Sequence, residues 1–307
     1  MKPLRIVFMG SPDFAVPSLE SINESNHTVV SVISGSDKRR RRRSAPEPTA
    51  VKQRALELNL PVFDADDMKS EELKNHLKDQ SADLFVVVAF KILPTSLLEI
   101  PALGSVNLHA SLLPKYRGAA PIHWAIINGE KKTGCTVFFL DKNVDTGSII
   151  NQKVTPIGPD ETTGELYERL KYLGADLLED SLDSIAKADY TLTPQEDEKA
   201  SPAPKLFKNN TRIDFNTPSG QIHNFVRGLN PFPGAWCLYD AKKMNVHKTV
   251  PGPDIPLEPG ELKNHDDALL AGAGEGTIEL KEIQLPGRKR MSGREFINGF
   301  DLEVGLN

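Results

Sequence analysis

The pattern of apolar and polar residues along this chain changes after residue 188. Before it, short apolar runs typical of buried strands fall at Arg5–Met9, Val29–Ile33, Leu84–Ala89, Ser105–Asn107 and Thr136–Leu140. Between these runs, apolar residues recur at helical spacing, as in Ala50–Leu58 and Glu71–Leu77. The alternation of strands and helices predicts an α/β domain with a mostly parallel sheet, whose ligand sites lie at the carboxyl ends of the strands.

The rest of the chain predicts two further parts. A long amphipathic helix at about 164–186 closes the α/β domain, which we expect to span residues 1–188. Residues 189–205 are rich in proline and charge and predict an exposed linker. Residues 206–307 combine one amphipathic helix with short strand candidates at Ala235–Tyr239, Met244–Val250, Ala268–Ala271 and Thr277–Leu285. That pattern predicts a small β-barrel or sandwich.

Length and composition agree with two domains in a cytoplasmic protein. The chain has 307 residues, whereas a single domain usually holds ~100–150. A run of about 18 apolar residues does not occur, so we expect no membrane span, no signal peptide and a cytoplasmic location. Cys135 and Cys237 each lie in an apolar run without a CxxC motif. We therefore expect two ordinary buried thiols instead of a disulfide or a zinc site.

The net charge of −5 is mild, but its distribution is uneven, because Lys38–Arg43 places six cations in a row. The run has three interpretations: a solvated loop, a nuclear-localisation-like patch, or a phosphate-binding segment. Phosphate binding has the strongest physical basis, because guanidinium groups match phosphate oxygens in pairs. Duplex DNA is not favoured, since no helix-turn-helix or finger pattern accompanies the run.

Three polar residues indicate chemistry. Asn107 and His109 are two apart, so on a strand their side chains share one face. Asp145 follows in a loop after the next strand candidate. An amide, an imidazole and a carboxylate can move an acyl group onto an amine without a covalent enzyme intermediate. From spacing alone, a polar strand end and an Asx-turn aspartate remain alternatives.

Several blocks together resemble the methionyl-tRNA formyltransferase family over essentially the whole chain. The blocks are Met9–Ala15, Val87–Pro94, Asn107–Ile122, Val144–Gly147, Leu229–Trp236 and Leu285–Lys289. The resemblance implies a Rossmann-like catalytic domain followed by an OB-fold-like barrel. It also implies transfer of a formyl group from 10-formyltetrahydrofolate to the α-amine of methionine on initiator methionyl-tRNA, for translation initiation, by a monomer that needs no metal.

The resemblance also assigns roles to residues. Asn107, His109 and Asp145 become the catalytic trio: the first two stabilise the developing oxyanion, while Asp145 orients His109, favours its protonated form and accepts the proton of the amine. The implied folate contacts are Phe90, Lys91, Ile92, Leu93, Ser111, Leu112, Leu113, Pro114, Asp141 and Val144.

Contacts to tRNA are implied in two places. A basic loop of the family corresponds to Lys38, Arg39, Arg40, Arg41, Arg42 and Arg43, where the usual glycines are missing but the charge is preserved. In the C-terminal part the candidates are Lys205, Lys208 and Arg212. Residues 207–307 hold 12 lysines and arginines against 13 aspartates and glutamates, so contacts there must come from local clusters.

Three other functions would keep part of this constellation. An amino-sugar nucleotide formyltransferase would share the trio and the folate loop, but would not need the arginine run or the C-terminal match. A hydrolase of 10-formyltetrahydrofolate would use water in place of the amine and would have little use for a polycationic loop. A tRNA- or folate-binding module without catalysis is disfavoured by the presence of all three catalytic residue types.

The arginine run generates the first prediction. Replacing Arg39–Arg43 by serine should raise the apparent KM for tRNA and flatten its salt dependence. Each neutralised duplex phosphate contributes about −0.9 to the slope of the logarithm of the binding constant against the logarithm of the salt concentration. The measurement is KM for tRNA across a series of salt concentrations. A slope equal to that of the unchanged protein would exclude the run from the interface.

Overall fold

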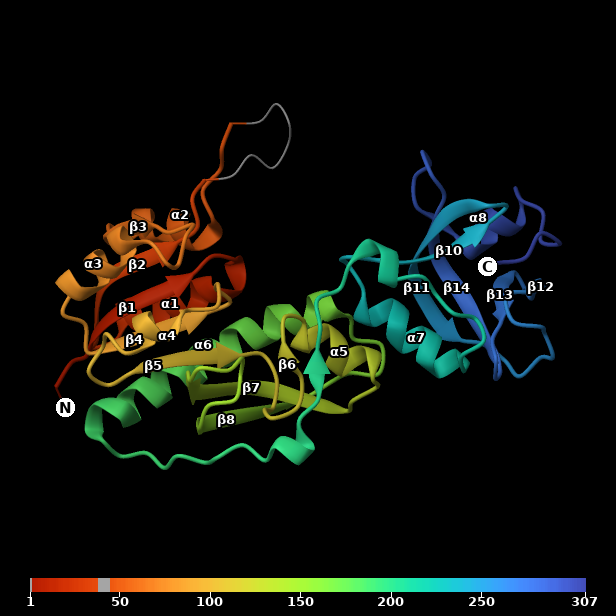
Figure 1. The fold of residues 1–307 in the computed structure, drawn as a ribbon. Helices are drawn as coiled ribbons and strands as arrows, with labels where there is room; N and C mark the ends of the chain where they lie inside the picture. The colour runs from red at the N-terminus through yellow and green to blue at the C-terminus, as the bar shows by residue number, and fades with distance from the viewer. Residues whose placement is uncertain (1, 38–44) are drawn as a thin grey trace. The chain divides into compact units, whose positions relative to one another are not determined.

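A computed structural model describes residues 2–37 and 45–307, which group into two units that are discontinuous in sequence (Figure 1). The first unit combines the described residues up to Gly118 with Gly134–Thr155 and Tyr167–Pro202. The second combines Ala119–Thr133, Pro156–Leu166 and Ala203–Asn307. The predicted domain limits at 188 and 206 therefore differ from this grouping, in which two earlier segments join the C-terminal residues.

The α/β prediction is confirmed by a seven-stranded sheet in the order β3-β2-β1-β4-β5-β7-β8. The strands are β1 Arg5–Gly10, β2 Thr28–Ser34, β3 Val62–Asp64, β4 Leu84–Val88, β5 Ser105–His109, β7 Lys132–Phe139 and β8 Ile149–Pro156. Strands β1 to β5 pair in parallel, whereas β7 runs antiparallel to β5. The five predicted apolar runs all become strands of this sheet. Strands β3 and β8 were not predicted, because neither has a continuous apolar run.

Helices cover the sheet: α1 Val16–Glu24 after a 3-10 turn at Asp13–Ala15, α2 Ala50–Glu57, α3 Glu71–Asp79, α4 Thr95–Leu98 and α6 Thr163–Lys187. Thr49 and Ser70 cap α2 and α3 by accepting hydrogen bonds from Lys52 N and Leu73 N. Helix α6 approaches the sheet closely at Gly174, where a Cβ would lie 2.8 Å from Leu108 Cδ2. Glycine at this position therefore permits helix and strand to pack together.

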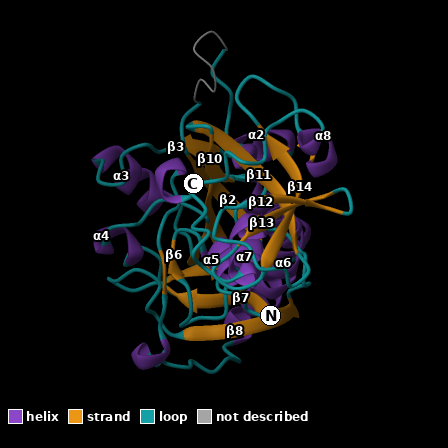
Figure 2. Cartoon of the chain, turned by 90° about the vertical axis from the view of Figure 1, so that its right-hand side faces the viewer, coloured by secondary structure: helices purple, strands orange, loops and turns teal. Residues whose placement is uncertain are grey.

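The second unit contains an antiparallel sheet, shown with its helices in Figure 2. Its path is β10-β11-β14-β13-β12, with β15 on β14. The strands are β10 Ala235–Tyr239, β11 Lys242–Pro251, β12 Leu262–His265, β13 Ala268–Gly272, β14 Thr277–Gln284 and β15 Met291–Ser292, and the helices are α5 Pro121–Ile127, α7 Ser219–Gly228 and α8 Gly293–Ile297. Ile222, Val226, Met244, Ile278 and Phe296 belong to its core. A small, mainly β unit was predicted, and its four strand candidates are confirmed.

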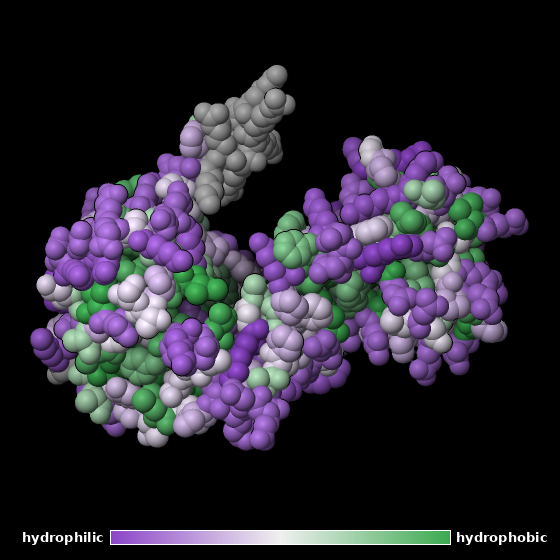
Figure 3. All heavy atoms as spheres, in the orientation of Figure 1, coloured by the Kyte–Doolittle hydropathy of each residue, from purple (hydrophilic) through white to green (hydrophobic). Residues whose placement is uncertain are grey.

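Hydrophilic residues cover most of the face drawn in Figure 3. Both cysteines lie in the interior. Cys135 and Cys237 are free and buried, as predicted, and burial raises the pKa of each thiol to about 12. Both thiols stay protonated near neutral pH, so neither is an active nucleophile there. Across residues 2–37 and 45–307, no helix combines the length and apolar character needed to cross a bilayer.

Gly147 lies in the loop between β7 and β8, where the backbone of β7 leaves no room for a side chain. A Cβ at Gly147 would lie 1.7 Å from Phe139 O. Gly147→Ala should lower the Tm by roughly 2–10 °C, because overpacking against a rigid backbone costs about 1–3 kcal/mol. Calorimetry checks this, with Gly220→Ala in α7 as the control, since a Cβ there meets nothing within 4 Å. Equal Tm values for Gly147→Ala and the unchanged protein would contradict the steric argument.

Candidate active site

Asn107 and His109 lie on β5, between two strands that hold it in register. Asn107 is opposite Val87 on β4 and Phe138 on β7, and His109 is opposite Thr136 on β7. His109 is buried and Asn107 is half-buried. The shared strand face predicted from the i, i+2 spacing follows from this regular pairing. The pairing therefore sets both side chains at the carboxyl end of the parallel strands, as expected for a ligand site.

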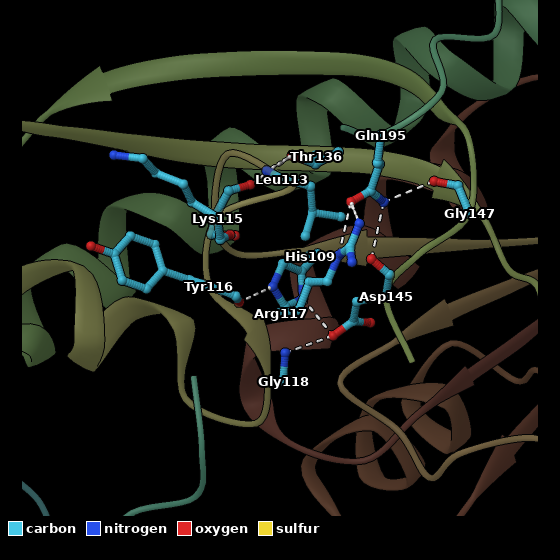
Figure 4. A network of polar contacts seen from close by, with 11 residues as sticks. His109, Leu113, Lys115, Tyr116, Arg117, Gly118, Thr136, Asp145, Gly147 and Gln195 are labelled. Carbon is cyan, nitrogen blue, oxygen red and sulfur yellow. Dashed lines mark hydrogen bonds and ion pairs between the residues drawn. The ribbon is translucent and has the colours of Figure 1, made fainter. Parts of the chain in front are cut away.

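His109 is oriented by a backbone group that sequence reasoning missed. Its Nε2 lies 2.8 Å from the carbonyl oxygen of Tyr116 (Figure 4). A carbonyl oxygen only accepts, so Nε2 carries a hydrogen and donates it. The other nitrogen, Nδ1, lies 3.8 Å from Asp145 Oδ2. This distance exceeds a direct hydrogen bond but leaves the two groups within strong electrostatic reach.

Asp145 is held in an uncommon backbone conformation with φ of 56°. Its Oδ2 accepts a hydrogen bond of 2.8 Å from the Gly118 N–H, which leaves the carboxylate beside His109 (Figure 4). The turn role considered for Asp145 belongs instead to Asp141, whose Oδ1 accepts from Asn143 N and Thr146 Oγ1. Asp141 therefore shapes the loop, and Asp145 is free to face the imidazole.

A cavity of about 110 Å³ opens beside these residues within the first unit. Its lining comprises Val87, Phe90, Lys91, Ile92, Leu93, Leu98, Asn107, Leu140, Asp141, Lys142, Asn143, Val144 and Asp145. Six of the ten predicted folate contacts are among them. The walls combine apolar side chains with a few polar groups, which is the usual composition of a small-molecule site. The ammonium of Lys91 is directed elsewhere, because it donates to the carbonyl oxygens of Ala65 and Asp66.

The other four predicted folate contacts, Ser111, Leu112, Leu113 and Pro114, do not line this cavity. Leu113 packs with Phe138 and Ile149, and its N–H donates to Thr136 Oγ1. The Thr136 hydroxyl in turn donates to Ser111 O. These contacts tie the turn after β5 to β7 and so support the backbone that leads to Tyr116. A folate contact at Ser111–Pro114 stays a prediction.

The residues predicted to contact tRNA fall into two groups. Lys38, Arg39, Arg40, Arg41, Arg42 and Arg43 lie outside the described residues. In the second unit, Arg212 lies 5.9 Å from the ring centroid of Trp236, and Trp236 Nε1 donates to Lys208 O. Lys243 Nζ, which sequence reasoning missed, lies 4.8 Å from the same ring. Lys205 lies 5.5 Å from the Phe207 ring. Phe207 is exposed and Trp236 is half-buried, and cations beside accessible aromatic rings are typical of nucleic-acid-binding surfaces.

No group of three or more His, Cys, Asp or Glu side chains placed to hold a metal ion occurs within residues 2–37 and 45–307. The site instead offers an amide, an imidazole and a carboxylate that converge beside a cavity. Such a group can stabilise an oxyanion and accept a proton in the same reaction.

Comparison with known proteins gives a consistent result. Residues 4–182 match the formyl transferase family and residues 205–301 match the formyl transferase C-terminal domain. The methionyl-tRNA formyltransferase of Chlorobium limicola is 48% identical over 98% of this chain and 97% of its own length. That of Geobacter sulfurreducens is 40% identical over 99% of this chain and 96% of its own.

Solved structures agree in fold. A crystal structure of an N-formyltransferase from Helicobacter canadensis, in complex with folinic acid and dTDP-3-aminofucose, has a TM-score of 0.69 at 22% identity. It covers 90% of this chain and 98% of its own. The resemblance seen in the sequence is confirmed by the near-complete coverage of the relatives, and this chain belongs to the formyl transferase family.

Proposed function

We propose that this protein transfers the formyl group of 10-formyltetrahydrofolate to the α-amino group of methionine on initiator methionyl-tRNA. One observation carries the proposal: Asn107, His109 and Asp145 meet beside a cavity in a chain that is 48% identical, almost end to end, to a methionyl-tRNA formyltransferase. The product, N-formylmethionyl-tRNA, serves translation initiation.

The geometry supports a direct transfer. The neutral amine attacks the formyl carbon, and negative charge develops on the formyl oxygen. The Asn107 amide can donate to this oxygen, and so can Nδ1 of a protonated His109, since Nε2 already donates to Tyr116. Asp145 accepts the proton of the amine directly or through water. The bond from carbon to the folate nitrogen then breaks as that nitrogen takes up the proton that the amine gave to Asp145.

The cavity is the proposed place of the donor's pterin ring. Phe90, Ile92 and Leu93 supply apolar contacts, and the Asp141–Asp145 loop supplies backbone donors and acceptors. Asn107 lines the same cavity, so a formyl group carried on the bound ring system would lie near the catalytic amide. Positioning of this kind can contribute up to roughly 7–11 kcal/mol to the lowering of the barrier.

For tRNA, we propose two contact regions. One is the Lys38–Arg43 run, whose charge suits the phosphate backbone. The other is the group around Trp236, with Lys208, Arg212 and Lys243, joined by Lys205 beside Phe207. The second group would allow a unit without net positive charge to bind RNA, since Arg212 and Lys243 lie near the Trp236 ring and Lys205 lies near the Phe207 ring.

The decisive experiment measures formyl transfer from 10-formyltetrahydrofolate to initiator methionyl-tRNA, with elongator methionyl-tRNA and a tRNA-free reaction in parallel. Formylation specific to the initiator supports the proposal. Formate release without tRNA would instead identify a hydrolase. Inactivity in both reactions, with transfer to an amino-sugar nucleotide, would identify the substrate class of the Helicobacter canadensis structure.

The catalytic assignment predicts the behaviour of two variants. Asn107→Ala and His109→Ala should each lower turnover by about 10²–10³-fold or more, because each removes a donor to the oxyanion. Binding of tRNA should persist, since neither residue belongs to the proposed tRNA contacts. His265→Ala is the matched control, because that imidazole lies in the second unit beside Asp266. Turnover at the unchanged level in either catalytic variant would refute the mechanism.

A further inference from the structure

The segment Thr193–Ser201 was predicted to be part of an exposed linker, but it is anchored to the first unit at both ends. Thr193 and Ile149 exchange two backbone hydrogen bonds, of 2.8 and 2.9 Å. At the other end, Arg117 N donates to Ser201 O at 2.9 Å, and Tyr116 N donates to Ser201 Oγ at 3.0 Å. The segment, which follows α6 in the chain, therefore lies along residues that build the active site.

One side chain of this segment, Gln195, reaches the catalytic loop (Figure 4). Its Nε2 donates to the carbonyl oxygens of Asp145 and Gly147, at 3.0 and 2.8 Å. Its Oε1 accepts from Nε and Nη2 of Arg117, at 3.1 and 2.8 Å. Both donor hydrogens and both acceptor positions of the amide are used, so its orientation is determined.

Gln195 contacts two segments that together fix the position of the Asp145 carboxylate. On one side is the backbone of Asp145, whose φ of 56° is uncommon for a residue with a side chain and persists only where the surroundings hold it. On the other side is Arg117, which precedes Gly118, the donor of the hydrogen bond to Asp145 Oδ2. A single amide thus joins the loop that carries the carboxylate to the short strand Arg117–Gly118, whose Gly118 N–H orients it.

We propose that Gln195 is a positioning residue for formyl transfer, which acts through Asp145. This inference rests on the proposed function. Gln195 does not line the cavity, so it has no direct contact with a ligand there. Its amide keeps the Asp145 carboxylate on the Gly118 N–H and 3.8 Å from His109 Nδ1. Without it, the carboxylate can leave the position from which it takes the proton of the amine.

The cavity itself should survive the loss of Gln195. The Asp141–Asp145 loop has its own support, because Asp141 Oδ1 accepts from Asn143 N at 2.9 Å and from Thr146 Oγ1 at 2.7 Å. Leu93 and Val87, which form another part of the lining, are buried in the core. We therefore expect the chemical step to change much more than donor binding.

Two variants separate the interactions of the amide. Gln195→Met keeps the length of the side chain and removes all four hydrogen bonds. Gln195→Glu keeps an acceptor for Arg117 but loses the donors to Asp145 and Gly147. Both should slow single-turnover formylation by about 10²-fold, the cost of a displaced catalytic group. KM for the folate donor should stay within about threefold, because the cavity lining other than Asp145 is retained.

Glu196→Met is the matched control, because the Glu196 carboxylate bonds Lys199 within the same segment. Its rate and Tm should equal those of the unchanged protein. An unchanged rate in Gln195→Met or Gln195→Glu would overturn the proposal, and so would a loss confined to KM or Tm.

A double variant distinguishes positioning of Asp145 from general support of the fold. If Gln195 acts through Asp145, Gln195→Met should cause little further loss in an Asp145→Asn background, because coupled residues are not additive. Losses that multiply would show that the two side chains act independently and would overturn the inference. Failure of the unchanged protein to formylate methionyl-tRNA is a different result, since it would remove the proposed function itself.

Discussion

The hydrogen bond from His109 Nε2 to the Tyr116 carbonyl is the contact on which the arrangement of the site depends. It decides which imidazole nitrogen faces Asp145, and it links the end of β5 to the turn that follows. That turn has its own restraints, because Ser111 Oγ donates to Lys115 O and Tyr116 N donates to Ser201 Oγ. The orientation of the His109 ring is therefore set by a backbone carbonyl, and the turn that carries this carbonyl is held by the hydroxyls of Ser111 and Ser201.

The sheet explains why these groups meet at one place. Strand β5 is parallel to β4, so the loop after β4 begins at the carboxyl end of β5. Strand β7 is antiparallel to β5 and ends beside Val106, so the loop after β7 begins at the amino end of β5 and brings Asp145 back to within 3.8 Å of His109 Nδ1. The first loop supplies Phe90–Leu93 and the second supplies Asp141–Asp145, on the two sides of Asn107. Functional residues often lie on loops at the end of a sheet, because the paired strands hold the ends of the loops in fixed positions.

Catalysis and substrate choice have different sources in this protein. Enzymes with sugar substrates share the fold at 20–22% identity, so the fold does not select the acceptor of the formyl group. The proposal for tRNA instead depends on matched length and identity with methionyl-tRNA formyltransferases. The proposal that the acceptor is tRNA also depends on positively charged side chains close to an aromatic ring, namely Arg212 and Lys243 beside Trp236.

The sequence by itself predicted most of the strands, though not β3 or β8, and the residue types of the candidate site. Apolar runs predicted β1, β2, β4, β5 and β7, and the spacing of Asn107 and His109 put both on one strand face, because these features depend on local periodicity. Only the tertiary structure decided how the trio is held. The Tyr116 carbonyl, the Gly118 N–H and the Gln195 amide act across long sequence separations or through backbone atoms. Their contacts arise only when the sheet and the segment Thr193–Ser201 are in place, and local patterns cannot encode them.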